Sequence, residues 1–320
     1  MPKRVRTREA VAATTSMAFL ERLHDFPLVL EIVPPHKRAN ETSVRKLVRR
    51  TEDAVRMIPH LDAVNVPEIL DENHSGMPFY RNMDPRRFAK HLADLPVERI
   101  VNKVVVQLPG MAGFDGWLKE SLYGYGLQNF VLVGGASSRI RYPGPTVPET
   151  NRRLRELTVG NADVALGNIL IPERPGEVER LLGKTLTGCR FFTTQVLFEP
   201  EPIATVLRKY GETCAFEGVE PATVLLSFAP VADYEDIEFL VWLGATITPE
   251  TEERLLAAAA EPGIASLEVA RSIFAKVREA IGTTPRPIPI GANVEEISTH
   301  NFELAVRMAQ EVPAWRDAKP

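Results

Sequence analysis

Eight short apolar runs, each followed by a helical pattern, constrain the fold of this chain more than any other feature. The runs are rich in β-branched residues and too short for buried helices, so we predict that they are strands. The predicted strands cover residues 28–33, 61–66, 99–108, 129–135, 162–171, 190–198, 223–228 and 287–291. The helical patterns cover residues 44–57, 84–95, 113–123, 148–157, 177–185, 201–209, 236–243, 252–259, 266–281 and 300–310. No hairpin joins two of the predicted strands, and such alternation requires a parallel sheet with right-handed crossovers.

The number of strand–helix units indicates a closed barrel rather than an open sheet. Eight units in roughly 290 residues fit an α/β fold of the (β/α)8 TIM-barrel type, in a single domain. No GxGxxG motif follows the first strand, which argues against a Rossmann dinucleotide-binding fold. We expect residues 1–24 to form a tail with a short helix near 15–23, and residues 25–320 to form the catalytic barrel. In such barrels the chemistry lies at the carboxyl ends of the strands.

The composition excludes several classes of function. The formal net charge of -4 gives no basic signal for nucleic-acid binding, and no apolar run reaches the ~18 residues of a membrane helix. The basic residues 1–8 are not followed by the apolar segment of a signal peptide. The two cysteines, Cys189 and Cys214, and the six histidines show no metal-ligand spacing. We therefore expect a reduced cytoplasmic protein without a bound metal.

The first predicted strand carries a charge where a buried strand should be apolar. This strand and the two prolines that end it have the sequence LVLEIVPP, residues 28–35. Alternation places Val29, Glu31 and Val33 on one face of the strand. A carboxylate among valines is costly unless it is paired or reaches solvent through a cleft. Glu31 is therefore either a structural acid tied to an arginine or an amide, or an acid with a raised pKa at the floor of a pocket.

Other polar residues lie late in the predicted strands, where the mouth of a barrel would be. Asn65 and Glu68 lie at the end of the second strand, Asn168 lies on the fifth strand and Gln195 on the sixth. A buried amide is costly without hydrogen-bond partners. Gln195 is therefore either a satisfied core residue or a ligand-binding group that shares the barrel mouth with Glu31.

Three motifs together resemble the methylenetetrahydrofolate reductase family. Residues 30–35, LEIVPP, resemble the family's first strand, and residues 192–198, FTTQVLF, resemble its Thr-Gln strand. The third motif is SFAPV at residues 227–231, followed by Tyr234 and by WLG at residues 242–244. The spacing of Lys184, Gly188 and Gln195 agrees as well. The resemblance covers about residues 27–311 in the same order, and the family is a (β/α)8 barrel.

The resemblance implies an oxidoreductase that reduces methylenetetrahydrofolate to methyltetrahydrofolate with hydride from NAD(P)H, through FAD or directly. Glu31 falls on the family's catalytic acid, which protonates a folate nitrogen so that the five-membered ring opens to an iminium. Gln195 falls on the glutamine that binds the pterin, and Tyr234 on an aromatic contact with substrate or nicotinamide. We add Asn65 and Glu68 as substrate-binding candidates, because they end a strand at the same expected mouth.

The resemblance also implies a flavin site, with one departure. Glu177 and Lys184 fall on positions that hold the flavin in relatives, and we expect Arg180, Asn168 and Gly134-Gly135 to complete the site. Relatives carry an Arg-Gly-Asp run on strand four, whereas this chain has VGGA at residues 133–136, without the arginine or the carboxylate. The family includes members that work without flavin. We expect a non-covalently held FAD, with a flavin-free enzyme as the alternative.

Two other functions stay open at the level of the sequence. One is a non-catalytic pterin-binding subunit of a one-carbon enzyme complex. The other is a phosphate-binding TIM-barrel aldolase, with Gly134-Gly135 as the phosphate loop. Lys103, the only lysine in a predicted strand, comes too early in its strand for a Schiff base, which argues against the aldolase. The sequence does not decide between NADH and NADPH, and a homo-oligomer is possible.

Overall fold

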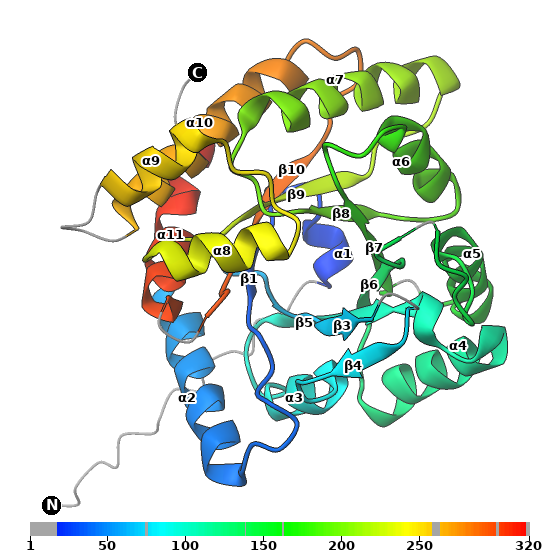
Figure 1. Cartoon of the computed structure of the whole chain (residues 1–320). Coiled ribbons are helices and arrows are strands. Elements are labelled where there is room, and N and C mark those ends of the chain that lie inside the picture. Colours follow the sequence, from blue (N-terminus) through cyan, green and yellow to red (C-terminus); the bar gives the residue numbers. More distant parts are fainter. Residues whose placement is uncertain are drawn as a thin grey trace, which may run out of the picture.

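Eight parallel strands close into a barrel, which confirms the (β/α)8 TIM-barrel prediction (Figure 1). Around the barrel the order is β1-β10-β9-β8-β7-β6-β5-β2, so the first and last strands are neighbours. The strands are β1 (Leu28–Glu31), β2 (Ala63–Val66), β5 (Glu98–Val104), β6 (Asn129–Val133), β7 (Ala165–Leu170), β8 (Phe191–Thr194), β9 (Thr223–Phe228) and β10 (Ile290–Glu295). This computed structural model describes residues 18–73, 76–137, 139–161, 163–257, 263–298 and 301–317.

Helices form the outer layer of the barrel (Figure 1). They are α2 (Glu41–Met57), α3 (Pro85–His91), α4 (Gly110–Lys119), α5 (Val147–Leu157), α6 (Glu177–Leu186), α7 (Pro200–Glu217), α8 (Tyr234–Trp242), α9 (Pro249–Ala257), α10 (Ile264–Ile281) and α11 (Phe302–Asp317). Local sequence decides where several of them begin. The Asn40 side chain accepts a hydrogen bond from the Ser43 amide at the start of α2, and Asp84 caps α3 ahead of Pro85. No helix in the described part of the chain is long and apolar enough to cross a membrane.

The amino-terminal half of the barrel interior is filled with apolar side chains. Every second strand residue points inward, and the inward set forms one buried cluster: Val29, Ala63, Ile100, Val131, Ala165, Phe191 and Leu225. The short helix α1 (Phe19–Arg22) closes this end, because Phe19 and Leu23 join the cluster. The Phe19 ring meets the Phe191 ring edge-on, with centroids 5.5 Å apart. A ligand site must therefore lie toward the opposite, carboxyl-terminal end.

The packing inside the barrel predicts a strong effect of one added methyl group. A Cβ on Gly167 would lie 2.4 Å from the Phe191 ring, which is boxed in by Phe19. We expect Gly167→Ala to lower the free energy of unfolding by about 1–3 kcal/mol, as overpacking does. Urea denaturation measures this effect. Gly183→Ala in α6 is the matched control, because its Cβ would meet nothing within 4 Å and alanine favours a helix. Equal stability of the two variants would contradict the prediction.

Several features of the fold differ from the sequence prediction. The strands predicted at 99–108 and 190–198 end at Val104 and Thr194, and residues 105–107 form a 3-10 helix. An antiparallel hairpin, β3 (Leu70–Glu72) with β4 (Pro78–Tyr80), lies between β2 and α3, although no hairpin is predicted. Its strands are too short to show an alternating pattern. The last barrel strand covers residues 290–295 rather than 287–291, because Pro287 and Pro289 have no amide hydrogen for the ladder. Of the expected tail and helix at 1–24, the structure describes only the part from residue 18. Residues 258–259 and 300 of two predicted helices also lie outside the described residues.

Candidate functional site

The carboxyl-terminal half of the barrel interior is polar, in contrast to its apolar floor. Strand alternation brings polar side chains from five neighbouring strands, β9, β10, β1, β2 and β5, to the inner face above the apolar cluster. These inward residues are Glu31, Asn65, Asn102, Ser227, Asn293 and Glu295. Buried polar groups gathered at the carboxyl ends of barrel strands mark a candidate ligand site.

Glu31 lies at the centre of this polar layer. The Asn65 side-chain amide donates a hydrogen bond of 2.6 Å to Glu31 Oε2. Glu31 is only 9% exposed, and burial raises its pKa to about 7, against the opposing effect of amide hydrogen bonds from Asn65 and Asn293. The structure thus brings together two of the residues predicted from the sequence, Glu31 and Asn65. It also gives Glu31 the raised pKa expected of an acid that keeps its proton near neutral pH.

Glu295 is a second carboxyl group in the same layer and is not among the residues predicted from the sequence. Glu295 on β10 pairs in register with Glu31 on β1, so both side chains point into the barrel. Burial raises the pKa of Glu295 well above its usual value, and the charge of Glu31 raises it further. Asn293 Nδ2 donates to Glu295 Oε1 at 3.1 Å and to Ser227 Oγ at 3.2 Å. The signal that could have found Glu295 is the alternation of residues 290–295, which continues past the two prolines.

The two carboxyl groups titrate as a pair. Like charges side by side in a buried site cannot both ionise easily, so burial raises the pKa of both carboxyl groups, to about 7 for Glu31, and the charge of Glu31 raises that of Glu295 further. At neutral pH the pair therefore holds at least one proton. A shared, buried proton in a barrel mouth is what acid catalysis requires.

Glu68 has partners of its own outside this layer. Its carboxylate accepts a hydrogen bond of 2.6 Å from Lys103 Nζ and one of 2.7 Å from the Val104 amide. Lys103 lies on the face of β5 opposite to Asn102 and is almost fully buried. The structure thus places Glu68 in an ion pair at the end of β5, with both carboxylate oxygens engaged.

Gln195 and Tyr234 lie at opposite ends of α8, and neither has a described hydrogen bond with Glu31. Gln195 follows β8, and its Nε2 donates a hydrogen bond of 2.8 Å to the carbonyl oxygen of Leu243, just after α8. Its Oε1 accepts a hydrogen bond of 3.3 Å from the Val196 amide. Tyr234 is the first residue of α8 and is 52% exposed. Gln195 therefore ties the end of α8 to the barrel, and Tyr234 lies at the other end of the same helix.

The residues expected to hold FAD do not form one cradle. Asn168 points out of the barrel and is fully buried, donating to the Leu132 carbonyl oxygen at 3.0 Å and exchanging hydrogen bonds with Asn151. The space over Gly135 is filled, because a Cβ there would lie 2.2 Å from the Tyr142 ring. The Tyr142 ring packs over Gly135, whereas a Cβ on Gly134 would meet only Val147 at 3.7 Å, so phosphate binding by this pair stays a prediction.

Glu177, Arg180 and Lys184 do lie together, on α6. Lys184 Nζ donates to the Ile169 carbonyl oxygen at 2.7 Å and lies 3.7 Å from Glu177 Oε1. Arg180 lies 3.8 Å from Glu177 Oε2. Glu177 at the start of α6 thus faces two cations, Arg180 and Lys184, the latter in the last turn of the helix. Asn168 is engaged with Asn151 and with the Leu132 carbonyl oxygen, so it does not extend this group.

The β3–β4 hairpin forms one wall of the barrel mouth. Glu72 on β3 accepts hydrogen bonds from Gln107 Nε2 at 2.6 Å and from the Tyr142 hydroxyl at 2.8 Å. These partners follow β5 and β6, so the hairpin is fixed to the loops after both strands. The ring that fills the space over Gly135 is thus held in place by the hairpin.

Comparisons with known proteins show a shared fold. No protein-family model matches the sequence, and neither does any curated protein. The structure is similar to that of an uncharacterized protein from Clostridium thermocellum that binds two copies of 5-methyl-5,6,7,8-tetrahydrofolic acid. The TM-score is 0.73, with 20% sequence identity over 92% of this chain and 99% of that one. A Bombyx mori aldo-keto reductase in complex with NADP has a TM-score of 0.46, with 10% identity over 89% of this chain and 87% of that one. This second likeness is too distant to carry an argument. The similarity to the Clostridium thermocellum protein shows that this chain and that protein have the same barrel fold.

Proposed function

We propose that this chain is a reductase of the methylenetetrahydrofolate reductase type, with Glu31 as its acid. The observation that carries the proposal is the carboxyl pair in the barrel mouth. Glu31 is buried beside Glu295, and its pKa of about 7 suits an acid that must hold a proton at neutral pH and then release it. Its place on the first strand is the one that the sequence resemblance assigns to the family's acid.

The substrate class is supported by a separate line of argument. The Clostridium thermocellum protein, which has the same fold, binds 5-methyltetrahydrofolate, and that compound is the product of the proposed reaction. A folate needs a few placed polar groups in an otherwise apolar site. In this chain Asn65, Ser227 and Asn293 offer such groups beside Glu31.

The proposed reaction needs one proton and one hydride. Glu31 donates its proton to N10 as the bond between N10 and the methylene carbon breaks, and the electron pair of that bond stays on N10. The carbon is then part of an iminium with N5. Hydride from NAD(P)H adds to this carbon and gives the N5-methyl group. Glu295 and Asn293 lie beside Glu31 and act on its pKa, and the proton that each turnover consumes is replaced from solvent before the next.

The hydride passes directly from the nicotinamide in this proposal. The side chains expected to hold FAD are engaged with one another or with the barrel wall, so we derive no step through a flavin. Nicotinamide and folate must then be bound at the same time. Holding both reactants in contact is the main contribution of such a site.

A flavin-free route predicts that NAD(P)H oxidation depends on folate. We expect the purified chain to be colourless and to show no NAD(P)H oxidation with an artificial electron acceptor when folate is absent. Added FAD should leave the rate with methylenetetrahydrofolate unchanged. Absorbance at 340 nm, read with and without each component, measures both quantities. Folate-independent oxidation that rises with added FAD would show that a flavin site exists and would contradict this prediction.

The proposal itself is tested by product formation. Purified chain, methylenetetrahydrofolate and NAD(P)H should give methyltetrahydrofolate and NAD(P)+ in equal amounts, measured by chromatography. If the chain binds methyltetrahydrofolate but forms no product with either coenzyme, the reductase proposal fails. That result would support a non-catalytic pterin-binding subunit.

A further inference from the structure

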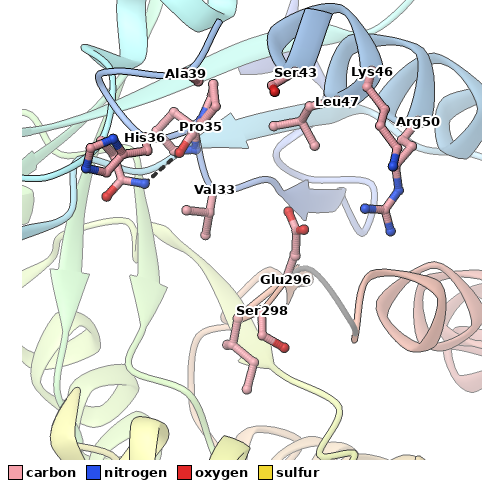
Figure 2. A pocket seen from close by; sticks show the side chains of 13 residues that line it. Val33, Pro35, His36, Ala39, Ser43, Lys46, Leu47, Arg50, Glu296 and Ser298 are labelled. Carbon is pink, nitrogen blue, oxygen red and sulfur yellow. Dashed lines mark hydrogen bonds between the residues drawn. The ribbon is translucent and has the colours of Figure 1, made fainter.

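A cavity lies beside the barrel mouth, on the opposite side of β1 and β10 from Glu31. Its volume is about 550 Å³, within the usual range for a small-molecule site. The walls come from the loop after β1, from α2 and from the loop after β10. Figure 2 shows the Glu296 side chain rising from the end of β10 toward α2, with Val33 and Arg50 on either side. Neither the sequence analysis nor the proposed reaction uses this cavity.

Glu296 forms a polar floor that lacks a full set of partners. It is only 3% exposed, and its Oε2 atom has no hydrogen-bond partner among the described residues. Burial raises the pKa of Glu296 to about 7, while the charge of Arg50 and a backbone hydrogen bond with Val33 favour its ionised form. A buried carboxylate oxygen without a donor is costly. The cavity is therefore suited to a ligand that brings N–H donors to the Glu296 carboxyl group.

The rest of the cavity defines the shape and charge of that ligand. Val33, Pro34, Leu47 and Ile297 give flat apolar walls. Lys46 and Arg50, one turn apart on α2, put positive charge at the rim. Arg50 is held there by Glu303 at 3.6 Å and by the Phe302 ring at 4.1 Å. A matching ligand is thus flat, carries N–H donors at one end and is anionic at the other.

The walls of the cavity are fixed before any ligand binds. Asn82 Nδ2 donates to the Pro34 carbonyl oxygen at 2.6 Å, which holds the loop after β1. The Asn301 side chain accepts hydrogen bonds from the amides of Ile297 at 3.3 Å and Ser298 at 3.1 Å, which holds the loop after β10. Such preorganisation lowers the entropy cost of binding.

We propose that this cavity binds a 2-amino-4-oxopyrimidine ring with an anionic tail, in which Glu296 accepts the ring N–H donors and Lys46 faces the tail. Pterins and guanine share this ring edge, with a ring N–H next to an amino group. A carboxylate matches that pair of donors, since it is acceptor-only when ionised. Adenine lacks the adjacent N–H group and should not fit. The proposal does not depend on the proposed reaction in the barrel mouth.

Calorimetric titration of the full chain tests the proposal with three probes: 5-methyltetrahydrofolate, GMP and AMP. We expect a binding event for 5-methyltetrahydrofolate, for GMP or for both that Glu296→Gln weakens about 10- to 100-fold. Lys46→Ala should weaken the same event about 2- to 5-fold, as loss of an exposed charge does. Arg45→Ala is the matched control, because Arg45 is an exposed neighbour on α2 that does not line the cavity. Comparing the affinities for 5-methyltetrahydrofolate and GMP tells whether the natural ligand of the cavity is a folate or a guanine nucleotide.

The outcomes for the two sites are separable. If the mouth also binds folate, wild type shows two events with 5-methyltetrahydrofolate and Glu296→Gln keeps one. If only the cavity binds it, Glu296→Gln loses the single event. The proposal is overturned if every event is unchanged in Glu296→Gln, or if AMP binds as tightly as GMP through Glu296. Circular dichroism of each variant confirms that an altered affinity does not come from unfolding.

Discussion

Replacing Glu31 with glutamine should reduce turnover with methylenetetrahydrofolate by about 100- to 10,000-fold, which is the usual contribution of a positioned acid. Glutamine keeps the size of the side chain and can still pair with Asn65, so the fold and the folate affinity should change little. The amide has no proton to give at N10, and this is why the loss should appear in kcat. Steady-state kinetics and calorimetric binding of methyltetrahydrofolate measure the two quantities.

The control for this experiment is Glu268→Gln, an exposed acid on α10, which should retain wild-type turnover. Near-native turnover in Glu31→Gln would show that the acid lies elsewhere. Glu295 would then be the next residue to test, since it shares the site and the proton.

Replacing Glu295 with glutamine should change the pH dependence of turnover more than its maximum. In the wild-type pair burial and the charge of Glu31 raise the pKa of Glu295, so the pair keeps a proton to higher pH than Glu31 alone would. In Glu295→Gln only Glu31 remains, and its protonated fraction falls as the pH rises through about 7. We expect little change at pH 6 and a loss of about tenfold at pH 8 relative to wild type.

The pH profile of kcat for both proteins is the measurement. A purely structural role of Glu295 predicts a loss that is the same at every pH. A profile of Glu295→Gln that is parallel to the wild-type profile would therefore contradict the shared-proton argument.

The sequence predicts most of the fold because its signals are local. Apolar runs, prolines and helix caps lie within a few residues of the elements they define. In the first strand they also show that Glu31 shares a face with Val29 and Val33. Strand alternation likewise suffices to place Asn65 beside Glu31 once the barrel is assumed. These features need no knowledge of distant contacts.

The remainder depends on contacts that no local sequence pattern shows. Nothing near Gly135 in the sequence indicates that the Tyr142 ring occupies the space above it, or that Glu72 fixes that ring. The ion pair of Glu68 with Lys103 likewise joins residues on different strands. Glu295 is a different case, since its alternation is visible and the two prolines only shift the apparent start of the strand.

The helix that closes the amino-terminal end of the barrel has a kinetic consequence for a two-substrate enzyme. With Phe19 and Leu23 packed against Phe191, both substrates must approach Glu31 from the carboxyl-terminal end. When two substrates enter an active site through the same opening, one of them blocks the binding and release of the other. The substrate whose reacting atom lies deeper has to arrive first, and its product has to leave last, so binding should follow a compulsory order rather than a random one.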